Sequence, residues 1–418
     1  MLDRNRYLLL SLLILLLAFG LRINAIADKA MWWDETWSVW ASQHNFAQTT
    51  EITARDVHPP LYQWTLFAWI RLVGISEFSV RTLSALIGTM TVAVVIPLTR
   101  RLSGNNATAL LAAFFVATST FHIHWSQETR MYIMAAMFAT MTVYAYLRIN
   151  DKWSKWWLLL IISALGAALS QYLGGLMLII LCLHWLIFRR SYRRDFHLLW
   201  IRAMIVVGLL FSVWMIYAFG LIRSSEGTTD FSPIVVFELA ATLLTVGKST
   251  ALSDYRLPML LFAGIYGGGM VIFARRNREK ATLIALVAIL PPLAIYLLSL
   301  PFTPFYSPKP EERYFVIFAP VVYAGLGLAL TQWWRINRLV GTFLIVIILI
   351  IFGKAYLDEA ESRYFRDDYA MMMGAIDILA QEDDPVFFIS GGRFPLVYYN
   401  LDRMTDGQSH LNINEIPA

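Results

Sequence analysis

The sequence is poor in cysteine and in charged residues, and both shortages narrow the class of protein. Its single cysteine, Cys182, lies inside an apolar run, which excludes an intramolecular disulfide and a cysteine metal cluster. Only 15% of the 418 residues are charged and 58% are hydrophobic, whereas about a quarter of the residues of a soluble domain are charged. The sequence also contains no internal repeat and no low-complexity segment. A water-soluble fold is therefore not expected.

The hydrophobic residues gather in long runs with almost no charge, of which 7–21 and 339–352 are clear cases. Such runs are typical of helices that cross a membrane. We expect the first run to be a retained helix, because no small-residue cleavage site follows it and Arg22, Asp28 and Lys29 come next. The net charge of +5 does not indicate nucleic-acid binding, since most basic residues lie in short loops between apolar runs.

Six clusters of basic residues separate the apolar runs and predict how the chain threads the membrane. Lys and Arg are retained on the cytoplasmic side, so an even number of crossings must separate neighbouring clusters. Three apolar stretches lie between Arg6 and Arg100, and 61–74 is too short to cross, because about 14 helical residues span roughly 21 Å against a hydrocarbon core of about 30 Å. We therefore expect 61–74 to lie on the outer membrane surface. The clusters are Arg4 and Arg6; Arg100 and Arg101; Arg148, Lys152 and Lys155; 189–194; Arg275, Arg276, Arg278 and Lys280; Arg335 and Arg338.

This threading predicts an all-α polytopic membrane protein with about eleven transmembrane helices. The expected crossings are 7–27, 79–99, 106–124, 129–147, 156–171, 174–188, 199–221, 257–274, 281–301, 313–331 and 338–354. The segments that then face outward are 28–60, 125–128, 171–172, 222–256 and 302–313. We expect 1–354 to form a transmembrane catalytic module with an acidic motif in outer loop 28–78. We expect 355–418 to form a small extracytoplasmic α/β segment.

Two adjacent acids stand in the first outer loop among several tryptophans. Asp34 and Glu35 are flanked by Trp32, Trp33, Trp37 and Trp40. The tryptophans alone are typical of an interfacial belt at a membrane surface, with solvated acids beside it. Carboxylates held against apolar rings also suit general-base chemistry, which makes the two acids candidate catalytic residues.

The same loop ends in a His-Pro-Pro motif, and the next outer loop carries an acid and an arginine. Pro59 and Pro60 are explained by the start of a helix, where proline is favoured, and His58 is then placed to bind an anion. Glu128 and Arg130 lie at the outer end of a membrane helix, where ionisable residues are costly and are candidates for function, although a helix-orienting ion pair is the alternative. His122 and His124 lack a convincing third metal ligand.

A third set of polar residues opens a late helix, in the sequence Glu311-Glu312-Arg313-Tyr314. Arg313 lies at the depth of lipid headgroups, and the forked donors of arginine clamp a phosphate better than lysine does. The alternative is a snorkelling anchor, but such anchors are commoner on the cytoplasmic side. Lys248, in outer loop 222–256, is a second candidate of the same kind.

Together these motifs resemble the GT-C glycosyltransferases of the protein mannosyltransferase and aminoarabinose transferase superfamily, similar to glycosyltransferase family 39. The resemblance covers 1–190 well and 300–330 moderately. Two features depart from the family pattern: Gln171-Tyr172 stands where members often have His-Tyr, and the C-terminal segment is shorter than usual. The motifs are Trp-x-Asp-Glu at 32–35, His-Pro-Pro-Leu-Tyr at 58–62, Ser-Gln-Glu-Thr-Arg-Met-Tyr at 126–132 and Arg-Tyr at 313–314.

The resemblance implies an inverting glycosyltransferase that moves a sugar from a polyprenyl-phosphate donor to a lipid, glycan or protein acceptor. Its site would face the extracytoplasmic side of the plasma or inner membrane. The resemblance assigns the catalytic base to Asp34, with Glu35 beside it, and the second-loop acid to Glu128. The expected donor-phosphate residues are His58, Arg313, Tyr314 and Lys248, and the supporting residues are Arg130, Tyr132 and Tyr172. The sugar, the acceptor and the use of a divalent metal stay open.

Two other classes of protein compete with this interpretation. A transporter or flippase of lipid-linked saccharides would explain the helices and the intramembrane charges, but it predicts repeated halves with broken helices, which the sequence lacks. It also has no need for a long outer loop with paired acids. A non-catalytic scaffold would leave Asp34, Glu128 and Arg313 unconnected, more than about 20 Å apart.

Overall fold

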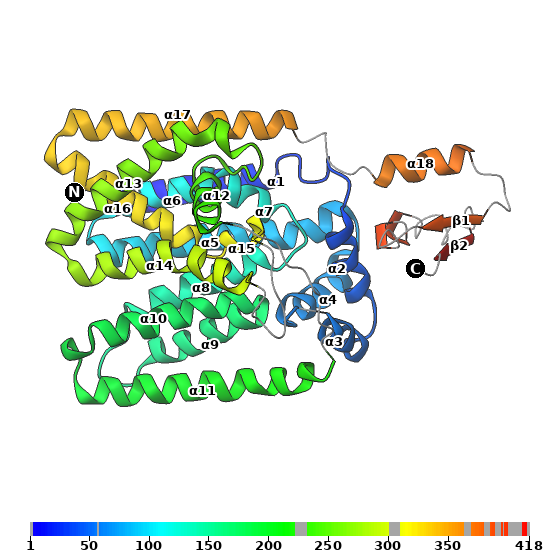
Figure 1. The fold of residues 1–418 in the computed structure, drawn as a ribbon, viewed down its shortest axis with the longest axis horizontal. Helices are drawn as coiled ribbons and strands as arrows, with labels where there is room; N and C mark the ends of the chain where they lie inside the picture. The colour runs from blue at the N-terminus through cyan, green and yellow to red at the C-terminus, as the bar shows by residue number, and fades with distance from the viewer. Residues whose placement is uncertain are drawn as a thin grey trace.

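The structure is a computed structural model in which most of the described chain is helical (Figure 1). It describes residues 3–56, 58–221, 232–300, 310–362, 369–379, 385–388, 394–395, 397–399 and 412–415. The helices that match the expected crossings follow one another in the predicted order. They are α1 (Arg4–Ile23), α5 (Glu77–Ser103), α6 (Asn106–Thr118) with α7 (Thr120–Ser126), α8 (Tyr132–Tyr146), α9 (Lys155–Ser170), α10 (Leu176–Ile187), α11 (Arg194–Phe219), α13 (Arg256–Arg276), α14 (Arg278–Leu298), α16 (Ala319–Ile336) and α17 (Arg338–Ser362).

Shorter elements connect these helices. They are α2 (Trp33–Gln43), α3 (Phe46–Arg55), α4 (Leu61–Val73), η1 (Tyr172–Gly175), η2 (Arg189–Ser191), α12 (Pro233–Val246), η3 (Leu252–Tyr255) and α15 (Glu312–Phe315). Helix α12 falls in the outer segment 222–256, for which the sequence analysis expected no helix. The chain ends in α18 (Tyr369–Leu379) and in strands β1 (Pro385–Phe388) and β2 (Asn412–Glu415), which pair in parallel.

The lengths of the helices support a membrane protein but leave the number of crossings as a prediction. Among the described residues, six helices are long and apolar enough to cross a membrane alone, or seven if α6 and α7 form one bent span. Their outward faces carry apolar side chains: on α11, Leu209, Val213 and Ile216 are 63%, 68% and 78% exposed. A face of this kind suits contact with lipid rather than with water.

The chain breaks between α6 and α7. Ser119 ends α6 and begins α7, where its hydroxyl accepts the N–H of His122, and the two helices meet at 59°. The carbonyls of Val116 and Ala117 accept hydrogen bonds from the buried guanidinium of Arg22, at 3.1 and 3.2 Å. Because Arg22 satisfies carbonyls near the break, α7 is held at an angle and carries the turn after Ser126 toward the first outer loop.

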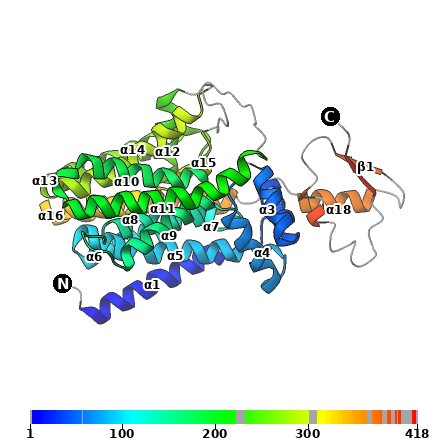
Figure 2. The ribbon, with the colours of Figure 1, turned by 90° about the horizontal axis from the view of Figure 1, so that it is seen from below.

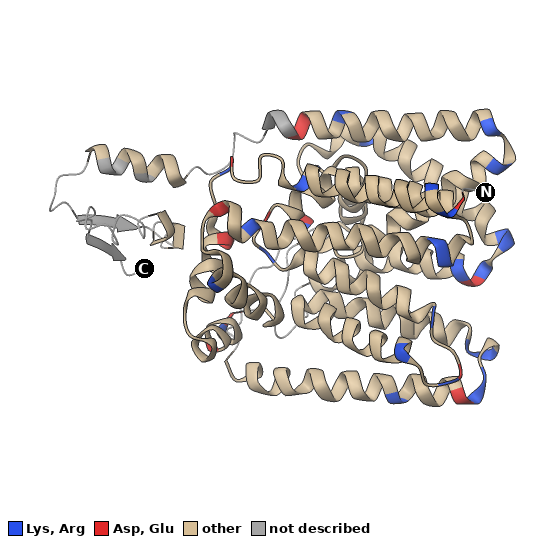
Figure 3. Ribbon diagram, turned by 180° about the vertical axis from the view of Figure 1, so that it is seen from behind, with Lys and Arg blue, Asp and Glu red and all other residues tan. Residues whose placement is uncertain are grey.

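The two ends of the bundle differ in chemistry. Helices α2, α3 and α4 pack against one another at the end of the bundle away from the N-terminus (Figure 1). The basic residues gather at the opposite end, beside the N-terminus (Figure 3). Figure 2 shows α1 along the edge of the bundle, and α18 and β1 beyond the end that carries α3 and α4. Helix α4 spans only 13 residues, which is shorter than the roughly 20 residues of a membrane-crossing helix.

Candidate active site

Asp34 lies in the first turn of α2, at the bundle end opposite the basic loops, and only 8% of it is exposed. Arg313 of α15 donates from Nη1 to Asp34 Oδ2 over 2.7 Å. Arg130 approaches the same oxygen at 3.5 Å and also donates to the Asp34 carbonyl over 3.1 Å. None of the described residues donates a hydrogen bond to Oδ1, so this oxygen keeps a lone pair with which to accept a proton.

Arg130 joins three parts of the site. Its Nη1 also donates to the hydroxyl of Ser38, one turn along α2, over 3.0 Å, and its Nη2 lies 3.0 Å from Nε2 of His58. Since an arginine only donates, His58 Nε2 accepts and the proton of the neutral imidazole lies on Nδ1. Burial, followed by the charges of Arg130 and Arg313, holds the pKa of His58 well below its usual value. His58 is therefore a neutral donor rather than a cation.

Unused donors converge around this pair of arginines. The Nδ1 of His58 and the Nε atoms of Arg130 and Arg313 are buried and have no hydrogen-bond partner among the described residues. The ring of Tyr132 lies within 6 Å of both guanidinium carbons, at 5.8 Å from Arg130 and 5.9 Å from Arg313. Tyr314 packs edge-on to Tyr132 with ring centroids 6.3 Å apart. Buried donors left without partners are costly, which is a reason to expect an anionic ligand here.

Glu35 is adjacent to Asp34 in sequence but takes part in a different contact. It is fully buried, and both of its oxygens accept hydrogen bonds from Arg81 of α5, at 2.8 and 2.7 Å. The N–H of Thr129 donates to the same carboxylate over 2.8 Å. Arg81 also donates to the carbonyls of Ile26, Lys29 and Ala30. Glu35 and Arg81 thus fasten the first outer loop to α5 and to the α7–α8 turn.

Glu128 and Lys248 belong to a polar network beside the arginine pair. The indole of Trp32 donates to Glu128, which places the second acid next to the start of α2. Lys248 donates to Glu359, at the end of α17, over 2.8 Å. His124 lies 3.2 Å from the other oxygen of Glu359 and 3.9 Å from Glu128. The sequence analysis missed Glu359, because it placed this residue in the C-terminal segment.

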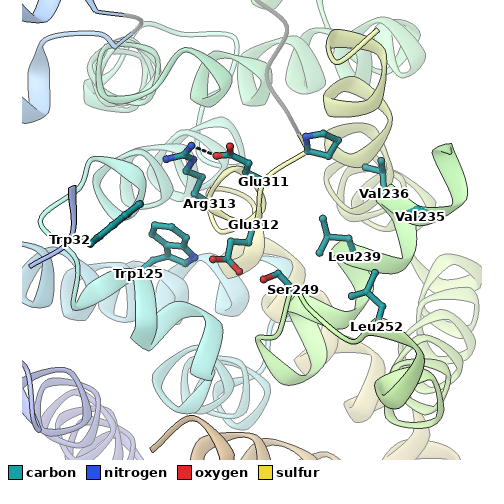
Figure 4. A pocket seen from close by; sticks show the side chains of 11 residues that line it. Trp32, Trp125, Val235, Val236, Leu239, Ser249, Leu252, Glu311, Glu312 and Arg313 are labelled. Carbon is teal, nitrogen blue, oxygen red and sulfur yellow. Dashed lines mark ion pairs between the residues drawn. The ribbon is translucent and has the colours of Figure 1, made fainter. Parts of the chain in front are cut away.

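A cavity of about 500 Å³ opens beside Arg313 (Figure 4). Its apolar wall comes from α12 and η3, through Val235, Val236, Leu239 and Leu252. Trp32, Trp125, Ser249, Pro310, Glu311, Glu312 and Arg313 complete the lining. Arg313 pairs with Glu311 at the edge of the cavity (Figure 4). The cavity therefore joins an apolar wall to a polar end that contains Glu311, Glu312 and Arg313, and Arg313 links this end to Asp34. An apolar wall next to an arginine suits a lipid phosphate.

Tyr172, an expected supporting residue, makes its described contacts away from Asp34 and Arg313. Its hydroxyl accepts the indole N–H of Trp214 over 2.9 Å, and its ring packs against Phe211 of α11.

The geometry of the described residues does not indicate a metal site. The part of the chain that the structure describes contains no group of three or more His, Cys, Asp or Glu residues suited to a metal ion.

The C-terminal segment also reaches the first outer loop. The hydroxyl of Tyr399 accepts the N–H of Met31 over 2.6 Å and donates to Glu77 over 2.5 Å. Tyr398 donates to the carbonyl of Ile75 over 2.8 Å. Met31 stands three residues before Asp34 and is fully buried. These contacts hold in place the first outer loop, which carries Asp34.

Known proteins share both the sequence pattern and the fold. The profile of the family described as dolichyl-phosphate-mannose-protein mannosyltransferase matches residues 57–217, which is less than half of the chain. ArnT from Cupriavidus metallidurans in the apo state superposes with a TM-score of 0.66 at 15% identity, over 93% of this chain and 83% of that one. The chain is therefore similar to the GT-C glycosyltransferases, in part of its sequence and in its fold. The resemblance expected from its motifs is confirmed.

Other GT-C structures show the same fold. ArnT bound to undecaprenyl phosphate has a TM-score of 0.61 at 14% identity, over 97% of this chain and 89% of that one. The Archaeoglobus fulgidus oligosaccharyltransferase, in complex with zinc and sulfate, has a TM-score of 0.59 at 14% identity, over 98% of this chain and 59% of that one. Comparison with curated proteins gives no match. At these identities the solved structures establish the fold of this chain and not its substrates.

Proposed function

We propose that this protein is an inverting GT-C glycosyltransferase that takes its sugar from a polyprenyl-phosphate donor at the extracytoplasmic face. The observation that carries the proposal is the ion pair of Asp34 with Arg313, which lines a cavity that is apolar on one side. The apolar wall on α12 suits an isoprenoid tail. The converging donors of Arg130, Arg313 and His58 suit a phosphate.

In this mechanism Asp34 accepts the proton of an acceptor hydroxyl or amine through Oδ1. The acceptor then attacks the anomeric carbon while the bond to the carrier phosphate breaks, which inverts the configuration. Arg313 and the Nδ1–H of His58 stabilise the negative charge that develops on the departing phosphate. For this, the phosphate replaces Glu311 as a partner of Arg313. Arg130 keeps Asp34 oriented through its carbonyl and through Ser38.

In the proposed mechanism the other expected residues Glu35, Glu128 and Lys248 do not act on the reacting groups. Glu35 holds the loop through Arg81 rather than touching a substrate. Glu128 fixes the indole of Trp32 at the cavity wall. Lys248 is paired with Glu359, so we place it outside the phosphate site. ArnT, which has the same fold, was solved with undecaprenyl phosphate, and this supports a lipid-phosphate ligand.

The proposal is tested by offering several polyprenyl-phosphate sugars to membranes that contain the protein. We expect at least one donor to be consumed with release of polyprenyl phosphate, and we expect no release from membranes that contain Asp34→Asn. Equal consumption in both membranes would remove Asp34 as the base. Movement of a lipid-linked saccharide across the bilayer without cleavage would favour the transporter instead.

A further inference from the structure

Glu312 differs from the acid beside it in having no partner among the described residues. Glu311 pairs with Arg313, whereas Glu312 forms no hydrogen bond or ion pair with any of the described residues. Figure 4 shows its carboxylate directed into the cavity, between Trp125 and Ser249. A carboxylate that is half-buried in a cavity and left without a donor is a hydrogen-bond acceptor available to a ligand.

Trp125 supplies a matching donor on the facing wall. The residue is 2% exposed, lines the cavity, and its indole Nε1 has no hydrogen-bond partner among the described residues. Figure 4 shows this nitrogen on the side of the ring that faces Glu312. Edge-on contacts with His124 and Tyr132, at centroid distances of 5.3 and 5.1 Å, fix the orientation of the ring. A buried indole N–H normally finds a partner, so the cavity is where its partner would bind.

The position of this pair beside Arg313 indicates what it would bind. Glu312 immediately precedes Arg313, and both line the cavity with Trp125. A group bonded to a phosphate on Arg313 would therefore lie within reach of an acceptor and a donor at once. Adjacent sugar hydroxyls have this pattern, because one donates while its neighbour accepts. The apolar wall on α12 offers the tail a separate place.

We propose that Glu312 and Trp125 form the subsite for the sugar of the donor, and that Glu312 selects sugars with a hydrogen-bond donor at this position. The inference rests on the proposed function, because it takes the phosphate to lie at Arg313. The carboxylate accepts from a hydroxyl or an ammonium group of the sugar, and the indole donates to a neighbouring oxygen. Glu312 and Trp125 thereby recognise the sugar, while Arg313 binds the phosphate of the carrier.

The test compares the binding of bare polyprenyl phosphate with that of sugar-loaded polyprenyl phosphate to purified protein in lipid nanodiscs. For Glu312→Gln we expect the affinity for the loaded carrier to fall about 10- to 100-fold, because a charged hydrogen bond is lost. For Trp125→Phe, which keeps a ring and removes the N–H, we expect a fall of about 2- to 10-fold. Binding of the bare carrier should stay unchanged in both variants. Glu51→Gln, on an exposed side chain of α3, is the matched control.

The outcomes separate this inference from the function on which it rests. Equal losses for bare and loaded carriers, or no loss for either, would overturn the sugar subsite while leaving a lipid-phosphate enzyme in place. Failure of the wild-type protein to bind any polyprenyl phosphate would overturn both. A panel of loaded carriers with hydroxyl, deoxy and amino sugars then distinguishes the ligand group. A Glu312→Gln loss confined to amino sugars assigns an ammonium, and a loss shared with hydroxyl sugars assigns a hydroxyl.

Discussion

Replacing Glu35 with Gln should destabilise the protein strongly, although Glu35 stands next to the proposed catalytic base. The side chains of Arg81 and Glu35 are 2% and 0% exposed, and two charge-assisted hydrogen bonds of 2.8 and 2.7 Å join them. Removing one charge leaves the guanidinium of Arg81 buried without its counter-ion. Breaking a buried pair in this way costs about 3–5 kcal/mol of unfolding free energy.

Tryptophan fluorescence during denaturation in detergent micelles measures this loss. Glu51→Gln is the control. Glu51 pairs with Arg55, and both side chains are about half exposed. Exposed ion pairs of this kind contribute less than about 1 kcal/mol to the unfolding free energy. The double variant Glu35→Leu with Arg81→Met removes both charges and should recover much of the lost stability. Wild-type stability in Glu35→Gln would refute the buried-pair reasoning and return Glu35 to the list of catalytic candidates.

Three further predictions concern the phosphate site, its histidine and the C-terminal contact. Arg313→Ala should weaken binding of bare polyprenyl phosphate about 10- to 100-fold, with partial recovery in Arg313→Lys, as measured by titration in nanodiscs. The pKa of His58 is depressed in the folded state, so the unfolded state binds more protons below about pH 6.5; stability should fall as pH drops from 7 toward 5, and less steeply in His58→Gln. Tyr399→Phe removes the hydroxyl that links Met31 to Glu77 and should speed amide exchange at Met31 in hydrogen–deuterium exchange, whereas unchanged exchange would argue against this link.

Most helices of the bundle could be predicted from the sequence, because long uncharged runs indicate the helices and basic loops indicate where one helix ends and the next begins. The run expected as one helix at 106–124 is the instructive exception. Its apolar residues continue across Ser119, yet the structure breaks there into α6 and α7. A serine inside an apolar run carries little periodicity signal, and the buried Arg22 that satisfies the carbonyls near the break comes from a different helix. Such long-range compensation is not readable from local sequence.

Part of the candidate site was also predictable. The orientation of the basic loops predicted that Asp34, His58, Glu128 and Arg313 lie on one side. In the structure Asp34 contacts both Arg313 and Arg130, and Arg130 contacts His58. Glu128 instead accepts the indole N–H of Trp32, at the start of α2. The partner of Glu35 was missed, although an arginine inside an apolar run is a costly residue that should have drawn attention to Arg81. Asp34 contacts Arg313 and Glu35 contacts Arg81 because the two side chains point in different directions from the first turn of α2. Their adjacency in sequence does not reveal these directions.

The roles proposed for Glu312 and Trp125 could not be predicted from the sequence, for a related reason. Both residues were visible, one beside Arg313 and the other in the second outer loop, but each is of a type common at membrane surfaces. Only the fold places them on facing walls of one cavity and shows that neither has a partner among the described residues. Unsatisfied hydrogen-bonding groups are a property of packing, so three-dimensional structure is needed to find them.

Single-turnover transfer by Asp34→Asn, measured together with donor binding, tests the central claim most directly. The amide keeps the shape of the side chain but does not accept the acceptor's proton at neutral pH. We expect the rate of transfer to fall about 10²- to 10⁴-fold, while the affinity for the polyprenyl-phosphate sugar changes little. A near wild-type rate would contradict the account and move the base to another acid, first of all Glu128.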